Sequence, residues 1–155
     1  MRIEPVIPDT MDIAIELLAR FFAEEGFATR PAEIAQNLYD MLADGTCWSA
    51  LAIEAATAVG VVTVTTMRYV EWGLLGEIGD IYVLPAWRCR GTAAMMIGVA
   101  LDWCHGKGCS AVSVTITPQG ERRHTLSQFY ARLGFESAGR TIMTKRLHPD
   151  MKSEA

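Results

Sequence analysis

The chain has 155 residues, of which 50% are hydrophobic and 21% are charged, and its formal net charge is −4. That length and apolar content suit one globular domain and argue against wholesale disorder and against a coiled coil. The excess of 18 acidic over 14 basic residues argues against a protein dedicated to nucleic acid. No run approaches the roughly 18 apolar residues of a membrane helix, and no secretory leader is visible, so we expect a cytoplasmic protein without a membrane partner.

Strands and helices alternate from the first residues onward. A strand is expected at 2–7. Asp9 then offers an N-cap for an amphipathic helix that ends at Gly26, and Pro31 opens a second helix that ends at Gly45. These two helices precede the region in which the β pattern dominates.

The middle of the chain is rich in β-favouring residues. We expect strands at 48–54 and 59–66, a loop at 69–76 that holds two glycines, and a central strand at 77–84. A proline directly after 77–84 ends that strand. This part of the chain therefore contributes most of the predicted sheet.

The last third continues the alternation. A long helix is expected after Gly91, followed by a strand at 111–116, a polar loop at 118–123, a short helix at 126–133 and a final strand at 141–147. The order β-α-α-β-β-β-α-β-α-β predicts a single α/β domain with a mixed sheet. We assign that domain to residues 1–148 and expect a frayed tail at 149–155.

The cysteines do not predict a metal site. They are scattered and form no CxxC pair, and the three histidines supply no matching spacing. We therefore expect no metal and interpret the cysteines as small, partly buried apolar side chains in a reducing compartment. They are Cys47, Cys89, Cys104 and Cys109.

The turn after the strand at 77–84 has the character of an anion site. Arg88, Arg90 and Gly91 follow the proline, and small residues open the next helix. The free N–H groups of a first helical turn and the two arginines favour a phosphate or pyrophosphate. Neither the GxxxxGK[ST] nor the GxGxxG pattern is present, so a P-loop and a dinucleotide fingerprint are both excluded.

The context of this turn resembles one family. The order is a strand, Val-x-Pro, Arg-x-x-Gly-x-Ala, a long helix, a β-branched strand and the string FYARLGF at 129–135. Together these features resemble the GCN5-related N-acetyltransferase (GNAT) family over about 48–147. The resemblance implies a mixed, mostly antiparallel central sheet flanked by helices, and acetyl-CoA as cosubstrate.

The resemblance also implies site residues. The turn would cradle the pyrophosphate of acetyl-CoA, and Tyr130 would face the thioester sulfur. Arg123 stands where the family often has an asparagine that contacts the pantetheine, which leaves that contact open. The cofactor-binding residues implied by strand and turn are Ile81, Tyr82, Val83, Arg88, Cys89, Arg90, Gly91, Thr92, Ala93 and Ala94.

Acyl transfer to an amine needs a base, an oxyanion donor and an acid. Glu77 and Asp80 are the candidate bases, and we prefer Asp80 because it lies in an apolar run. Strand alternation puts the two on opposite faces unless a bulge at Gly79 re-aims them. The resemblance implies a backbone N–H at or near Val83 as the oxyanion donor and Tyr130 as the acid. The alternative for Glu77 and Asp80 is that they are ordinary strand-end or salt-bridged carboxylates, and the alternative for Tyr130 is that it is a core tyrosine.

The two halves of the sequence differ in charge. Residues 1–80 hold 13 acidic and 4 basic side chains, and residues 81–155 hold 5 acidic and 10 basic. The basic half suits a polyphosphorylated cosubstrate. The acidic half suits a cationic small-molecule amine such as an aminoglycoside or polyamine, and the chain has a diffuse likeness to aminoglycoside 3-N-acetyltransferases. The carboxylates considered for the acceptor are Glu24, Glu25, Asp40, Asp44 and Glu71.

Several alternatives stay open at this point. The acidic surface is equally consistent with a solvated helix face. The acceptor is either a small amine or a protein or peptide, and a non-catalytic acyl-CoA-binding regulatory module is the competing class. In the loop at 69–76, Tyr69 and Trp72 either stack on a sugar or form the contact of a homodimer.

Overall fold

The computed structural model describes residues 1–148, and the predicted frayed tail at 149–155 lies outside these described residues. Five strands form one sheet in the order β1-β2-β3-β4-β5. Neighbours pair antiparallel except β4 and β5, which are parallel. The strands are β1 (Arg2–Pro5), β2 (Cys47–Glu54), β3 (Thr57–Tyr69), β4 (Gly73–Val83) and β5 (Ala111–Val114).

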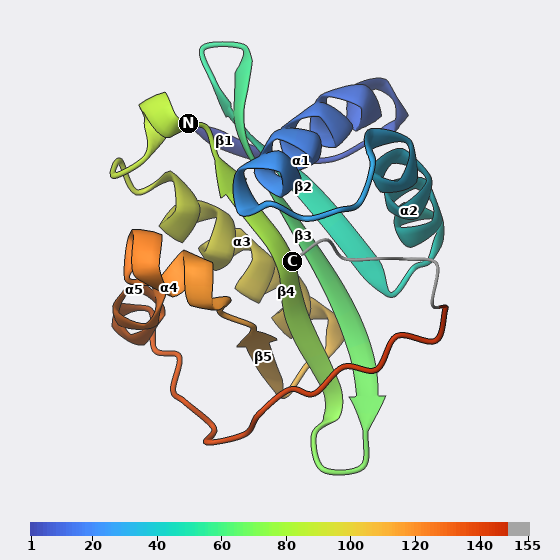
Figure 1. The fold of residues 1–155 in the computed structure, drawn as a ribbon, viewed down its shortest axis with the longest axis vertical. Helices are drawn as coiled ribbons and strands as arrows, with labels where there is room; N and C mark the ends of the chain where they lie inside the picture. Colours follow the sequence, from blue (N-terminus) through green and yellow to red (C-terminus); the bar gives the residue numbers. More distant parts are fainter. Residues whose placement is uncertain (149–155) are drawn as a thin grey trace.

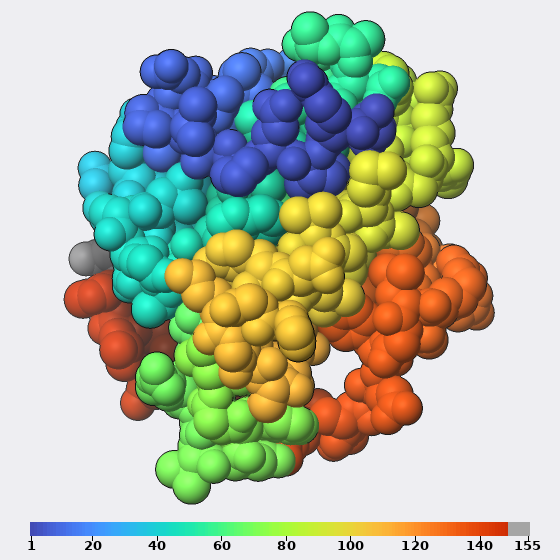
Figure 2. Space-filling view, turned by 180° about the vertical axis from the view of Figure 1, so that it is seen from behind, coloured from blue at the N-terminus to red at the C-terminus, as the bar shows by residue number. Residues whose placement is uncertain are grey.

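Helices cover both faces of this sheet (Figure 1). Helices α1 and α2 pack on one face against Leu51 and Val61. Helix α3 packs on the other face against Val62 and Val64, and in Figure 2 it lies across the centre of the molecule seen from behind. The helices are α1 (Met11–Glu25), α2 (Pro31–Ala43), α3 (Thr92–Lys107), α4 (Pro118–His124) and α5 (Leu126–Arg132).

The central strand β3 is covered by helices on both faces of the sheet. Its residues from Val59 to Val64 are buried, and both side-chain directions are covered. A strand covered on both faces carries apolar side chains in succession rather than in alternation. The predicted α/β class with a mixed sheet flanked by helices is therefore confirmed.

Strands β4 and β5 separate at one end of the sheet. They pair only from Leu75 with Ala111 to Ile78 with Val114, and β4 continues to Val83 beyond that point. The edge of β4 from Gly79 onward therefore has no strand beside it on the β5 side within the described chain. This separation opens the sheet next to the turn that the sequence marks as an anion site.

Strand β4 carries an irregularity at Gly79. Asp80 pairs with Thr63 and Ile78 pairs with Val64, so Gly79 has no partner on β3. Such a bulge shifts the side-chain alternation by one residue. Glu77, which pairs with Thr65, therefore lies on the same face of the sheet as Asp80.

Two predictions for the C-terminal third are wrong. The expected loop at 118–123 is helix α4, which Thr117 caps by accepting a hydrogen bond from the Gly120 N–H at 3.0 Å. The expected strand at 141–147 forms no strand within the described residues. Its side chains are exposed and no neighbouring strand supplies the ladder hydrogen bonds.

Candidate active site

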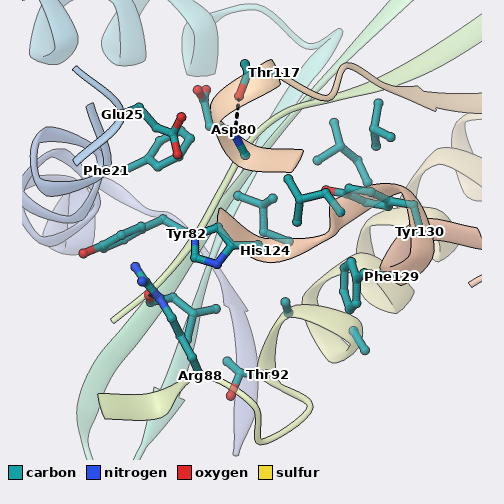
Figure 3. A pocket seen from close by; sticks show the side chains of 18 of the residues that line it. Phe21, Glu25, Asp80, Tyr82, Arg88, Thr92, Thr117, His124, Phe129 and Tyr130 are labelled. Carbon is teal, nitrogen blue, oxygen red and sulfur yellow. Dashed lines mark hydrogen bonds between the residues drawn. The ribbon is translucent and has the colours of Figure 1, made fainter. Parts of the chain in front are cut away.

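A cavity of about 540 Å³ lies where β4 and β5 separate. Its wall is built by the end of α1, the second half of β4, the turn before α3, the first turn of α3, and helices α4 and α5. Figure 3 shows Tyr82 and Arg88 on one side of this space and Phe129 and Tyr130 on the other. One cavity thus joins segments from residue 21 to residue 132.

The turn before α3 has a backbone that favours an anion. Gly91, its N-cap residue, has a φ of +80°, and Cys89 has a φ of +58°. The residues that open the helix are small and line the cavity, and the N–H groups of a first helical turn have no partner within the helix. A phosphate group is stabilised at such a helix start by these donors and by the helix dipole.

Nine of the ten predicted cofactor residues line the cavity. Arg90 does not line it, and its guanidinium lies 5.0 Å from the ring centroid of Trp87. The nine that line it are Ile81, Tyr82, Val83, Arg88, Cys89, Gly91, Thr92, Ala93 and Ala94. The fit of this wall to a pyrophosphate rests on backbone N–H groups and small side chains.

Arg88 is engaged by the protein itself. Its Nη2 lies 2.8 Å from one carboxylate oxygen of Glu24 and 2.9 Å from the other, and its Nε donates to the Val83 carbonyl at 2.9 Å. Its guanidinium also lies 5.5 Å from the ring centroid of Tyr82. The hydrogen bond and charge of Glu24 raise the pKa of Arg88, although burial opposes this.

Tyr130 lies in the wall of the cavity from α5. The residue is only 5% exposed, and its ring packs edge-on against Phe129 and Phe135 at centroid distances of 5.2 and 5.3 Å. No hydrogen bond of its hydroxyl is found within residues 1–148. Burial raises the pKa of Tyr130 to about 12. The phenol therefore keeps its proton through the neutral range.

Asp80 lines the cavity, whereas Glu77 does not. Asp80 accepts a hydrogen bond from the Thr63 hydroxyl at 2.7 Å, and its backbone N–H donates to the same hydroxyl oxygen at 3.0 Å. Burial raises the pKa of Asp80 above its ordinary value, while the hydrogen bond from Thr63 acts in the opposite direction. A carboxyl group with a raised pKa is a stronger base once it is ionised.

Sequence reasoning did not identify several side chains of this wall, among them Phe21, Phe27 and His124. Phe27 follows the glycine that ends α1, and its N–H donates to the Phe22 carbonyl at 2.9 Å. An apolar residue just after such a glycine commonly packs back on its helix, which is the signal for Phe27. His124 was missed together with α4, although a threonine cap followed by proline marks that helix start.

Arg123 turns toward α1. Its Nη1 donates to the backbone carbonyl of Glu24 at 3.0 Å, and Gln119 donates to the same oxygen at 3.2 Å. The residue at the position of the expected asparagine thus links α4 to the end of α1.

Among residues 1–148 no group of three or more histidine, cysteine or acidic side chains is arranged to hold a metal ion.

The chain belongs to the Acetyltransferase (GNAT) family, whose model matches residues 12–135. This confirms the resemblance drawn from the turn and the FYARLGF string. Within the described residues no helix has the length and apolar character needed to cross a membrane.

Two curated relatives are sugar or aminoglycoside acetyltransferases. Glucosamine 6-phosphate N-acetyltransferase 1 of Oryza sativa subsp. japonica is 31% identical over 116 residues, which are 72% of this chain and 63% of that protein. Aminoglycoside N(6')-acetyltransferase type 1 of Salmonella typhimurium is 34% identical over 67 residues, which are 43% of each chain. The chain therefore matches less than two thirds of the length of either relative.

Solved structures share the fold. The chain is similar to aminoglycoside N-acetyltransferase AAC(6')-Iy in complex with CoA, with a TM-score of 0.81, 21% identity and coverage of 95% of both chains. It is also similar to an integron cassette protein from the mobile metagenome of Cole Harbour salt marsh, with a TM-score of 0.83 and 23% identity over 95% of this chain and 91% of that one. These aminoglycoside relatives carry 6' names rather than the 3-N position considered from the sequence.

Proposed function

We propose that this protein transfers the acetyl group of acetyl-CoA to a primary amine of a small cationic acceptor. The observation that carries the proposal is the single cavity that joins the α3 turn, Asp80 and the Tyr130 hydroxyl. In this proposal the turn binds the phosphates of the donor, Asp80 is the base and Tyr130 is the acid. The family membership supports the same reaction class.

In the proposed mechanism the acceptor attacks directly. Asp80, directly or through a water molecule, takes a proton from the ammonium group, and the neutral nitrogen attacks the thioester carbonyl carbon. A backbone N–H at or near Val83 stabilises the oxyanion, and the carbon–sulfur bond then breaks as Tyr130 gives its proton to the sulfur. The acetylated nitrogen loses its extra proton to the Tyr130 phenolate, directly or through water, which restores the phenol. The products are the N-acetyl amine and CoA. Glu77 is the second candidate base because the Gly79 bulge puts it on the face of Asp80.

Most of the carboxylates that the sequence suggested for binding the acceptor already have partners within the protein. Glu71 forms an ion pair with Arg140 at 2.6 Å, and Glu24 is paired with Arg88. Asp40 accepts a hydrogen bond from Gln36 and Asp44 accepts one from the Thr46 N–H. Glu25 is the remaining carboxylate of this set, and it lines the cavity.

Glu25 is therefore the residue that we propose binds an ammonium group of the acceptor. Figure 3 shows it beside Phe21, on the same side of the cavity as Asp80. An aminoglycoside or a polyamine fits this proposal, and the aminoglycoside relatives support a small-molecule amine.

The cellular setting is part of the proposal. We expect a cytoplasmic protein that uses no nucleic acid partner, and we expect a homodimer formed through the β3–β4 hairpin. Tyr69, Val70 and Trp72 are exposed at that hairpin, which supports a contact there. Light scattering on the purified chain tests the homodimer, because a monomer mass would contradict it.

A CoA-release assay tests the reaction. Acetyl-CoA is offered with aminoglycosides, polyamines, glucosamine 6-phosphate, amino acids and N-terminal peptides, and thiol release is followed with each. Amine-dependent release on an aminoglycoside or polyamine supports the proposal. Release only on peptides would indicate a protein acetyltransferase, and confirmed CoA binding without release on any amine would indicate a regulatory module.

A further inference from the structure

Glu24 contacts segments that border the cavity on different sides. Its carboxylate binds Arg88 in the α3 turn through both oxygens, and its backbone carbonyl accepts hydrogen bonds from Gln119 and Arg123 of α4. Glu24 itself belongs to α1 and lines the cavity. The residues joined in this way lie 64 to 99 positions apart in the chain.

Arg88 also contacts the end of β4. Its Nε holds the Val83 carbonyl at 2.9 Å, and the N–H of Leu84 in the same peptide unit donates to the Val59 carbonyl at 2.9 Å. The last peptide of β4 is thus fixed from both sides. It follows directly on the N–H of Val83, which is the proposed oxyanion donor.

The charge state of the pair is stable around neutrality. The hydrogen bond from Arg88 lowers the pKa of Glu24, although burial acts in the opposite direction. The two side chains are 28% and 27% exposed, so the pair is partly shielded from solvent. Because the Glu24 carboxylate and the Arg88 guanidinium bind each other, neither is free to make a strong contact with a ligand.

We propose that Glu24 is a positioning residue that holds Arg88 and, through it, the end of β4 in the geometry needed for acetyl transfer. The inference rests on the proposed function and goes beyond it, because it assigns a role to a residue that does not touch the reacting atoms. A positioning residue acts on the transition state more than on substrate binding. Its loss therefore lowers kcat and leaves the KM values nearly unchanged.

The experiment compares Glu24→Gln with Glu16→Gln. The Glu24→Gln substitution keeps the size of the side chain and leaves the backbone carbonyl in place. Glu16 is a matched control on the same helix, because it is exposed and does not line the cavity. It forms an ion pair with Arg20, with 2.8 Å between the nitrogen and the carboxylate oxygen. We expect Glu24→Gln to lower kcat about tenfold or more, with KM for acetyl-CoA within about threefold, and Glu16→Gln to equal the wild type.

A double-variant cycle with Arg88→Gln tests the connection. If Glu24 acts through Arg88, the double variant is no slower than the slower single variant, because the two residues form one unit. Additive losses would overturn the inference. A rise in KM for the acceptor with unchanged kcat would also overturn it, because Glu24 would then bind the acceptor directly.

A measurement without turnover separates this inference from the proposed function. Amide hydrogen exchange at residues 84–91 should increase in Glu24→Gln and stay at the wild-type level in Glu16→Gln. If the wild type transfers no acetyl group, the proposed function fails, and unchanged exchange at 84–91 would overturn the positioning role as well. If the wild type is active and Glu24→Gln matches it, only the positioning role fails.

Discussion

Replacing Tyr130 by phenylalanine separates its proposed chemistry from its packing. The ring contacts with Phe129 and Phe135 at 5.2 and 5.3 Å are kept, because only the hydroxyl is removed. No hydrogen bond of that hydroxyl is found within residues 1–148, so none is lost in the variant. The free energy of unfolding at neutral pH should therefore change by no more than about 0.5 kcal/mol.

The effect on turnover should be much larger. A positioned general acid contributes roughly 10²–10⁴-fold to the rate, so we expect kcat to fall at least about a hundredfold, or about 2.7 kcal/mol in activation free energy. The affinity for acetyl-CoA should stay within a few-fold because the α3 turn is untouched. The assay is thiol release under saturating acetyl-CoA and acceptor, with CoA affinity measured by calorimetry.

The same variant tests the buried phenol through alkaline stability. The tyrosine ionises near pH 10 in the unfolded chain, and its folded pKa is raised to about 12. The folded state therefore holds the proton more tightly, so this contribution is intact below pH 10 and is lost as the pH rises toward 12. Urea unfolding at rising pH should show the wild type losing up to about 3 kcal/mol that the phenylalanine variant does not lose.

Tyr39→Phe is the matched control, because Tyr39 lies on α2 and is 51% exposed. It should retain wild-type kcat and the wild-type alkaline profile. Unchanged kcat in Tyr130→Phe would remove this residue from the mechanism. A loss of several kcal/mol at neutral pH would show that the hydroxyl has a structural role instead.

Five further substitutions test other residues of the site and the core. Asp80→Asn should abolish most turnover in the thiol-release assay. Thr63→Val should move the acidic limb of the pH–rate profile to higher pH, because it removes a hydrogen bond that favours the ionised form of Asp80. Gly91→Ala should weaken CoA binding in calorimetry and cost about 1–2 kcal/mol in unfolding free energy, because φ is +80° there. Gly76→Ala should cost about 1–3 kcal/mol in urea unfolding, because its Cβ would lie 2.6 Å from a buried cysteine sulfur. Glu25→Gln should raise KM for a cationic acceptor and leave KM for acetyl-CoA unchanged.

The features that were predictable from the sequence are local. The turn after β4 is predicted from a proline, two arginines, a glycine and small residues within ten positions, and the structure places this turn beside a cavity. Strand β3 is predicted because its sequence is rich in β-favouring residues. Such patterns need no knowledge of a distant partner.

The features that were left open, missed or wrong depend on distant partners. The sequence left the face of Glu77 open, because the possible bulge at Gly79 is set by the register against Thr63 and Val64 on another strand. The segment 141–147 has a strand-like sequence, but no strand lies beside it in the described chain. The link between Glu24 and Arg88 joins residues 64 positions apart, and neither neighbourhood indicates it.

The opposite charges of the two sequence halves have a structural use. Glu24 with Arg88 and Glu71 with Arg140 each join an acidic side chain of the first half to an arginine of the second half. Partly exposed pairs of this kind contribute little to the free energy of unfolding, so their main effect is on orientation. The carboxylates used in this way are unavailable to a cationic acceptor, which leaves Glu25 and Asp80 in the cavity wall. A preference for polycations, if the amine panel reveals one, must therefore come from these two carboxylates rather than from the acidic surface as a whole.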